Sequence, residues 1–119
     1  MSASDARGRA VLVMTSVGDD EAARRLALAL VGENLAACVS RSAVRSVYRW
    51  EDAPPVPPRE MAVCEDEEVL LLVKTSASRL ADVEKRILEL HPYACPEVVA
   101  IDADRVEGRY LDWLLACVE

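Results

Sequence analysis

The sequence is poor in glycine, histidine and aromatic residues, and each shortage excludes a class of function. Its 119 residues include four glycines, one histidine, no phenylalanine, two tryptophans and three tyrosines. The glycines are scattered, and none belongs to a G-x-x-x-x-G-K-[ST] loop of the kind that holds nucleotide phosphates. A catalytic Ser-His-Asp or Cys-His set would have to use the single histidine, His91.

Positive charge and long apolar runs are also scarce. Fourteen Lys and Arg oppose twenty-one Asp and Glu, and the resulting net charge of −7 argues against a broad basic face that binds nucleic acid. No apolar run approaches the roughly 18 residues of a membrane helix. The short run 10–14 lacks the length and the cleavage site of a signal peptide. We therefore expect a cytoplasmic protein that binds neither nucleic acid nor a membrane.

The cysteines are few and far apart along the chain. They are Cys38, Cys64, Cys95 and Cys117, and no two of them form a C-x-x-C pair. A structural zinc ribbon or a dithiol redox site is therefore not expected. We expect free thiols that mostly serve as small packing residues.

Hydrophobic periodicity divides the chain into strands and helices. Residues 1–9 are small and polar and predict a disordered tail, which a single domain over residues 10–119 follows. Four of the six prolines lie within residues 52–58 and predict a loop there. The predicted elements are strand 10–14, helix 21–30, strand 44–50, strand 69–73, helix 80–90, strand 97–101 and helix 110–118.

This β-α-β-β-α-β order with an added C-terminal helix predicts an α+β fold of the ferredoxin-like kind. Because β-α-β crossovers are right-handed, both long helices should cover one face of an antiparallel sheet. The fold hosts many unrelated activities. We expect no enzyme, since the loop 16–20 is acidic where acylphosphatases of this fold have a basic phosphate-binding loop. The predicted central strands also lack the stacking aromatics of RNA-recognition domains.

Five segments, in this order and at this spacing, resemble the CutA family of divalent-cation-tolerance proteins. The resemblance extends from about Val11 to Leu114. The segments are 34–39 (NLAACV), 46–51 (SVYRWE), 67–75 (EEVLLLVKT), 91–97 (HPYACPE) and 110–114 (YLDWL).

The resemblance implies a protomer with an extended hairpin between its second and third strands, assembled as a tight homotrimer. Tyr48, Trp50 and the apolar run 69–73 independently favour assembly, because an exposed apolar strand edge invites pairing with another chain. The chain departs from the family pattern at two places. Residues 52–63 are longer and richer in proline than the usual turn, and Met14 stands where some relatives carry cysteine.

The resemblance also implies weak binding of copper(II) or another divalent cation, with the histidine of His-Pro-Tyr, His91, as a ligand. Imidazole suits copper and zinc, and copper leads the divalent affinity order. Cys95 lies four residues further on and is a second candidate ligand. Alternatively, His91 caps the C-terminal end of its helix, where the helix dipole favours a positive charge.

CutA trimers are similar to the PII signal proteins, which implies an alternative function. The protein would then be a small-molecule-sensing or signalling scaffold with ligand clefts between its subunits. Trp50, Lys74, Tyr93 and Glu97 fall at strand ends or in loops, where such a cleft forms. An aromatic ring, a cation and a carboxylate together would suit a small polar anion or zwitterion. Otherwise, Trp50 and Tyr93 are packing residues of a subunit interface.

Overall fold

The computed structural model describes residues 8–51 and 56–119, and it confirms the predicted α+β, ferredoxin-like order with a C-terminal helix. The predicted tail falls mainly on residues 1–7, which lie outside the described residues, as do residues 52–55 of the predicted loop. The elements are β1 (Ala10–Val17), α2 (Asp20–Gly32), β2 (Cys38–Arg49), η1 (Pro58–Glu60), β3 (Val63–Ser76), η2 (Ala77–Arg79), α3 (Leu80–Leu90), β4 (Val99–Asp102) and α4 (Gly108–Val118).

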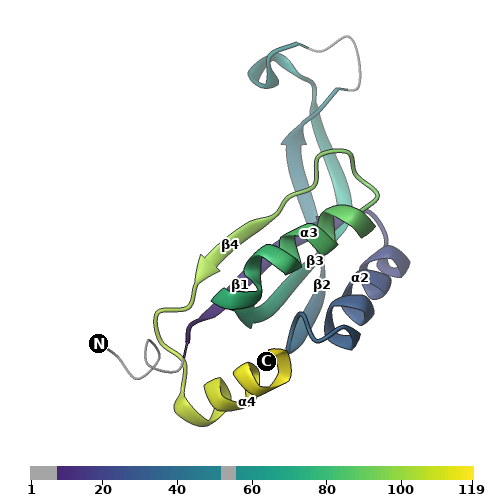
Figure 1. Ribbon diagram of the computed structural model, residues 1–119. Helices are drawn as coiled ribbons and strands as arrows, with labels where there is room; N and C mark the ends of the chain where they lie inside the picture. The colour runs from purple at the N-terminus through teal and green to yellow at the C-terminus, as the bar shows by residue number, and fades with distance from the viewer. Residues whose placement is uncertain (1–7, 52–55) are drawn as a thin grey trace.

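The four strands form one antiparallel sheet in the order β2-β3-β1-β4 (Figure 1). Val13 of β1 lies opposite Val73 of β3 on one side and opposite Ala100 of β4 on the other. Opposite residues in such pairs share a sheet face, so the register assigns every side chain to one of two faces.

Helices α2 and α3 cover one of these faces, as Figure 1 shows. The odd-numbered residues Val13 and Val73 point to this side and are fully buried with Leu30 of α2 and Ile87 of α3. Burial of these aliphatic side chains supplies the main stabilisation of the fold. The chain therefore closes its principal core between the sheet and two helices.

Local sequence signals set the ends of α2. The Asp19 carboxylate accepts a hydrogen bond of 2.8 Å from the backbone N–H of Ala22, which is the N-cap arrangement. The helix ends before Asn34, whose φ of 60° is a left-handed conformation that asparagine tolerates better than most residues. These two signals fix the ends of the helix, and its buried face carries Leu26 and Leu30.

The opposite sheet face carries no helix over most of its length. Its apolar side chains are half-buried or exposed: Leu12, Met14, Leu70, Leu72, Val99 and Ile101. Helix α4 packs at the end of the sheet where β1 begins, with Leu111, Leu114 and Val118 buried against Ala10 and Ala37. One end of the sheet is thus closed and most of this face stays open.

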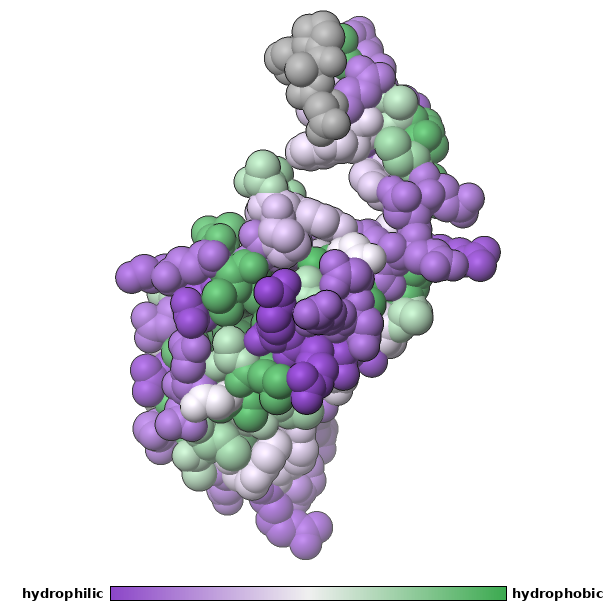
Figure 2. All heavy atoms as spheres, turned by 90° about the vertical axis from the view of Figure 1, so that its right-hand side faces the viewer, coloured by the Kyte–Doolittle hydropathy of each residue, from purple (hydrophilic) through white to green (hydrophobic). Residues whose placement is uncertain are grey.

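Strands β2 and β3 extend beyond the sheet as a hairpin, which confirms the predicted extension. Pairing of β1 with β3 stops at Val17 opposite Val69, whereas β2 and β3 remain paired as far as Arg49 opposite Val63. Figure 2 shows this hairpin projecting from the body of the molecule. The acidic run 65–68 lies inside β3 because both faces of a projecting hairpin meet solvent.

None of the helices in residues 8–51 and 56–119 combines enough length with enough apolar character to span a lipid bilayer.

Candidate functional site: an aromatic hollow and its histidine anchor

His91 ends helix α3 and is held by three hydrogen bonds to the backbone. Its own N–H donates to the Ile87 carbonyl at 2.8 Å. In its ring, Nε2 lies 2.8 Å from the Ser16 carbonyl oxygen and Nδ1 lies 3.1 Å from the backbone nitrogen of Tyr93. Since the Tyr93 N–H only donates, Nδ1 accepts, and the ring hydrogen sits on Nε2 and is donated to Ser16. His91 is 7% exposed, and both of its ring nitrogens have hydrogen-bond partners.

His91 is the C-cap residue of α3, which is the alternative position that the sequence suggested for it. Its ring nitrogens are bonded to backbone groups: the lone pair of Nδ1 is used by Tyr93, and Nε2 carries the hydrogen donated to Ser16. His91 thereby fastens the α3–β4 loop to the end of strand β1. The Ser16 carbonyl is brought close only by the fold, so the sequence carried no signal for this contact.

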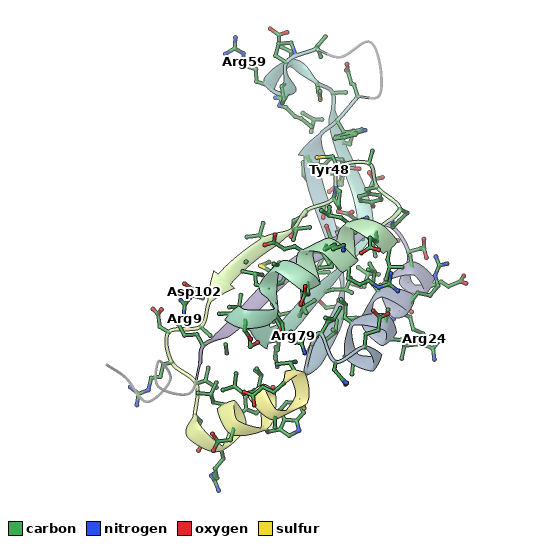
Figure 3. All side chains as sticks on the ribbon, in the orientation of Figure 1. Arg9, Arg24, Tyr48, Arg59, Arg79 and Asp102 are labelled. Carbon is green, nitrogen blue, oxygen red and sulfur yellow. The ribbon has the colours of Figure 1, made fainter. Side chains whose placement is uncertain are left out.

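The α3–β4 loop and the hairpin enclose a hollow of about 630 Å³. We call it the aromatic hollow, because three aromatic rings line it. Figure 3 labels one of them, Tyr48, where the hairpin passes the loop that follows α3. The lining side chains that bear on chemistry are Tyr48, Trp50, Glu68, Tyr93, Cys95 and Glu97.

The structure brings together three of the four predicted cleft residues. Trp50, Tyr93 and Glu97 line the aromatic hollow, and so does Cys95. Lys74 does not: its Nζ lies 3.4 Å from the hydroxyl of Tyr110 and 5.6 Å from the centre of that ring, beside α4. Six residues of extended strand separate positions 68 and 74, a rise of about 20 Å. Within one chain, Lys74 therefore lies apart from the other three predicted cleft residues.

Sequence reasoning missed two residues of the hollow, Tyr48 and Glu68. Tyr48 alternates with Trp50 on one strand face, and this periodicity was a usable signal. Glu68 lies opposite Val44 through the β2–β3 register, which the sequence leaves open. Within the acidic run, Asp66 shares the sheet face of Glu68 and the other two residues point to the opposite face, so composition alone does not single Glu68 out.

Two tyrosine–carboxylate hydrogen bonds shape the electrostatics of the hollow. The hydroxyl of Tyr93 donates to Glu68 at 2.9 Å, and the hydroxyl of Tyr48 donates to Asp66. The bond to Asp66 raises the pKa of Tyr48 to about 12. Partial burial and then the bond to Glu68 raise the pKa of Tyr93. Both hydroxyls therefore stay protonated donors, and the local negative charge resides on carboxylates.

The hollow supplies only part of a metal site. Cys95 is an exposed free thiol beside Glu97, and these are donors that a divalent cation accepts. Within residues 8–51 and 56–119, however, His, Cys, Asp and Glu side chains nowhere gather in a group of three or more that would hold a metal. One chain therefore offers a partial ligand set, and the ring nitrogens of His91 are bonded to backbone groups and not directed at Cys95 and Glu97.

The fold defines a class, the ferredoxin-like proteins with a projecting β2–β3 hairpin, and comparison with known proteins narrows it to one family. The model of the family described as CutA1 divalent ion tolerance protein matches residues 11–117. The chain belongs to this family.

Individual relatives are similar in sequence to this chain over nearly its whole length. The divalent-cation tolerance protein CutA of Thermus thermophilus is 41% identical over 104 residues, covering 87% of this chain and 92% of the relative. Its counterpart in Pyrococcus horikoshii is 34% identical over 105 residues, covering 88% of this chain and 94% of the relative. The solved Thermus thermophilus structure has a TM-score of 0.81 at 39% identity, covering 92% of this chain and 99% of its own.

Two further relatives correct the expected cytoplasmic location. An Arabidopsis thaliana protein, 35% identical over 105 residues and covering 87% of this chain and 53% of the relative, is named chloroplastic. The Archaeoglobus fulgidus structure is titled periplasmic. It has a TM-score of 0.82 at 27% identity and covers 92% of this chain and 99% of its own. Composition and free thiols do not settle the compartment, since this fold occurs under names from several.

Proposed function

We propose that this protein acts in tolerance to divalent cations by binding them weakly as a homotrimer, with copper(II) among its ligands. The observation that carries the proposal is the set of donor groups that line the aromatic hollow. They include the Cys95 thiol and the Glu97 carboxylate on the α3–β4 loop, with Glu68 on strand β3. The relatives are named for tolerance to divalent cations and not for a reaction. We accordingly propose binding without catalysis.

The donor set supports weak and exchangeable binding. A thiolate favours soft metals and a carboxylate favours hard ones, so the pair accepts copper and zinc without selecting sharply between them. Tight structural sites use four protein ligands, and catalytic zinc sites use three. With two donors from one chain, the remaining positions fall to water or to a neighbouring subunit.

The uncovered sheet face supports assembly. Val99 and Ile101 are 47% and 45% exposed, beside the half-buried Leu70 and Leu72. An apolar surface of this kind, running over neighbouring strands, is typical of a face that another chain covers. The number three follows from the resemblance to the family, whose members it implies are trimers.

The cation site is tested by calorimetric titration with zinc(II), which does not oxidise thiols, and then with copper(II). We expect Cys95→Ser to weaken binding about tenfold or more, and Glu97→Gln to weaken it less, because the thiolate is the stronger donor. Cys117→Ser, at a half-buried thiol within α4, is the matched control. Unchanged binding in both site variants contradicts the site. Loss of binding only in His91→Ala would restore the histidine as the ligand.

Assembly is tested by sedimentation equilibrium. We expect a trimer mass for the wild type and a monomer for Leu72→Glu, because a charge would be buried in the contact. Leu28→Glu is the control, since Leu28 is 56% exposed on the helical surface. A monomeric wild type contradicts the proposal, and so does a trimer that tolerates Leu72→Glu as readily as Leu28→Glu.

One observation favours a second candidate function, the small-molecule-binding scaffold. The volume of about 630 Å³ falls within the range of about 300–1,000 Å³ usual for small-ligand pockets. It is far larger than a single metal ion requires, and aromatic rings contribute no metal ligands.

A further inference from the structure

The three rings of the aromatic hollow are on the surface, and the two tyrosine rings are held in place by side-chain hydrogen bonds. Tyr48, Trp50 and Tyr93 are 39%, 43% and 41% exposed, although they belong to the largest side chains of the protein. The two tyrosine hydroxyls are tied to carboxylates of strand β3, and the backbone N–H of Trp50 donates to the Ala62 carbonyl at 3.0 Å. Ordered aromatic rings that line a hollow, and do not enter a core, indicate a surface prepared for an apolar or π-binding group.

The charge around these rings is negative. Glu68 and Glu97 line the hollow, and none of its described lining residues is lysine or arginine. The arginines of strand β2 next to it are engaged elsewhere: Arg45 pairs with Glu67 at 3.7 Å, and Arg49 donates to the Met61 carbonyl at 2.8 Å.

More distant arginines do not change this charge. In Figure 3, the labelled Arg9, Arg24 and Arg79 lie well away from Tyr48, and Arg59 lies at the far end of the hairpin. With Lys74 beside α4, the hollow lacks the cation that an anion or zwitterion would need. An anionic ligand would be repelled by the two glutamates.

Aromatic faces and carboxylates attract the same kind of ligand. The negative faces of Tyr and Trp rings attract a positive charge within about 6 Å, and they suit a diffuse, weakly hydrated charge best. Carboxylates at the edge of such a cage add long-range attraction. We propose that the aromatic hollow binds an organic cation of the alkylated ammonium class, held by its three rings and two glutamates. This inference rests on the second candidate function, the small-molecule scaffold, and names its ligand.

The test uses tetramethylammonium chloride as the probe and tert-butanol as its neutral partner of similar shape. In the intact assembled protein, Trp113→Phe leaves Trp50 as the single tryptophan of each chain, so tryptophan fluorescence reports on the hollow directly. Sodium chloride at equal ionic strength controls for screening. We expect saturable quenching by tetramethylammonium, and an affinity for tert-butanol at least about tenfold lower, within the range of cation–π contributions.

Variants locate the binding on the hollow. By calorimetry, we expect Trp50→Leu to weaken tetramethylammonium binding about tenfold, with Glu68→Gln and Glu97→Gln weakening it a few-fold each. Glu84→Gln on α3 makes the same charge change away from the hollow and is expected to have no effect. Trp50→Leu should leave zinc(II) binding unchanged, because an indole ring is not a metal ligand. This different response separates the organic-cation site from the metal proposal.

The outcomes distinguish failure of the ligand class from failure of the scaffold. Equal affinity for tetramethylammonium and tert-butanol, both lost in Trp50→Leu, overturns the cation preference while the scaffold stands. No saturable binding of either probe overturns both. An affinity that responds equally to Glu84→Gln and Glu97→Gln reflects net charge alone and overturns the inference. A Trp50→Leu variant that changes the oligomeric mass instead shows that another copy of the chain fills the hollow, which also overturns it.

Discussion

The two faces of the sheet are built from the same strands but differ in how deeply their side chains are buried. On the helix side, Val13, Leu71 and Val73 are fully buried. One residue along, Leu72 is only half-buried, although it is equally apolar. The difference shows that apolar sequence does not by itself make a core, because a strand side chain is buried only where another layer covers its face. The uncovered face is therefore where this protein has apolar surface available for partners.

The open face also differs between its two ends. At the hairpin end, the hydroxyls of Tyr48 and Tyr93 donate to carboxylates. At the other end, Tyr110 lies below the ammonium of Lys74 and packs on Trp113 with ring centres 5.3 Å apart. One end thus concentrates negative charge around its rings, and the other already has its cation. This contrast is the reason that we place a cation site at the hairpin end only.

The largest expected effect tests whether the covered sheet face is packed more tightly than the open one. Leu71→Ala should lower the free energy of unfolding by about 2–5 kcal/mol, because it leaves a cavity in the covered core. Leu72→Ala should cost the isolated chain less, since this side chain is already partly in water. Urea unfolding at low protein concentration measures both. Equal losses for the two leucines would mean that the open face is packed as tightly as the covered one.

The next effect concerns the anchor between β1 and the α3–β4 loop. His91→Ala should lower the free energy of unfolding by about 1–3 kcal/mol, because it leaves the Ser16 carbonyl and the Tyr93 amide without partners. Hydrogen exchange at the Tyr93 amide should become faster, by the factor that corresponds to this loss of free energy. If that amide exchanges at the wild-type rate, the ring does not hold the loop.

A smaller effect is expected at the helix that covers the core. Asp19→Ala removes the N-cap hydrogen bond to Ala22 and should cost about 1 kcal/mol of unfolding free energy. Asp19→Asn keeps an oxygen acceptor and serves as the matched control, with a stability close to that of the wild type. Thermal unfolding compares the two. Equal destabilisation by both substitutions would assign the effect to charge and not to the cap.

The smallest effect appears at alkaline pH, on the open face. Tyr48 holds its proton more tightly when folded, with a pKa of about 12 against 10.0 for an ordinary tyrosine, chiefly through its bond to Asp66. Its contribution to stability is therefore complete below pH 10.0 and is lost as the pH rises through about 12. The ultraviolet absorbance of phenolate should show a late-ionising tyrosine that disappears in Tyr48→Phe. An unchanged titration curve in that variant would contradict the assignment.

Periodicity predicted the elements but underestimated the lengths of the first three strands, while β4 is shorter than the predicted strand 97–101. The segment predicted as strand 69–73 is part of β3 (Val63–Ser76), because the acidic residues before Val69 are paired in a hairpin that solvent surrounds. The end of α3 at His91 was predictable, since the residue before a proline avoids helical geometry. The contact of its ring with Ser16 was not predictable, because Ser16 is 75 residues away and only the packed fold brings it near.

Local sequence therefore determined the order of helices and strands, the hairpin and the family, because these depend on residue spacing and on side-chain type. Tertiary structure alone decided which glutamate meets which aromatic ring, that Lys74 joins Tyr110 and not Trp50, and that His91 anchors a loop. Each of these depends on strand register and loop path. A shift of register by one residue would turn every side chain of a strand to the other face.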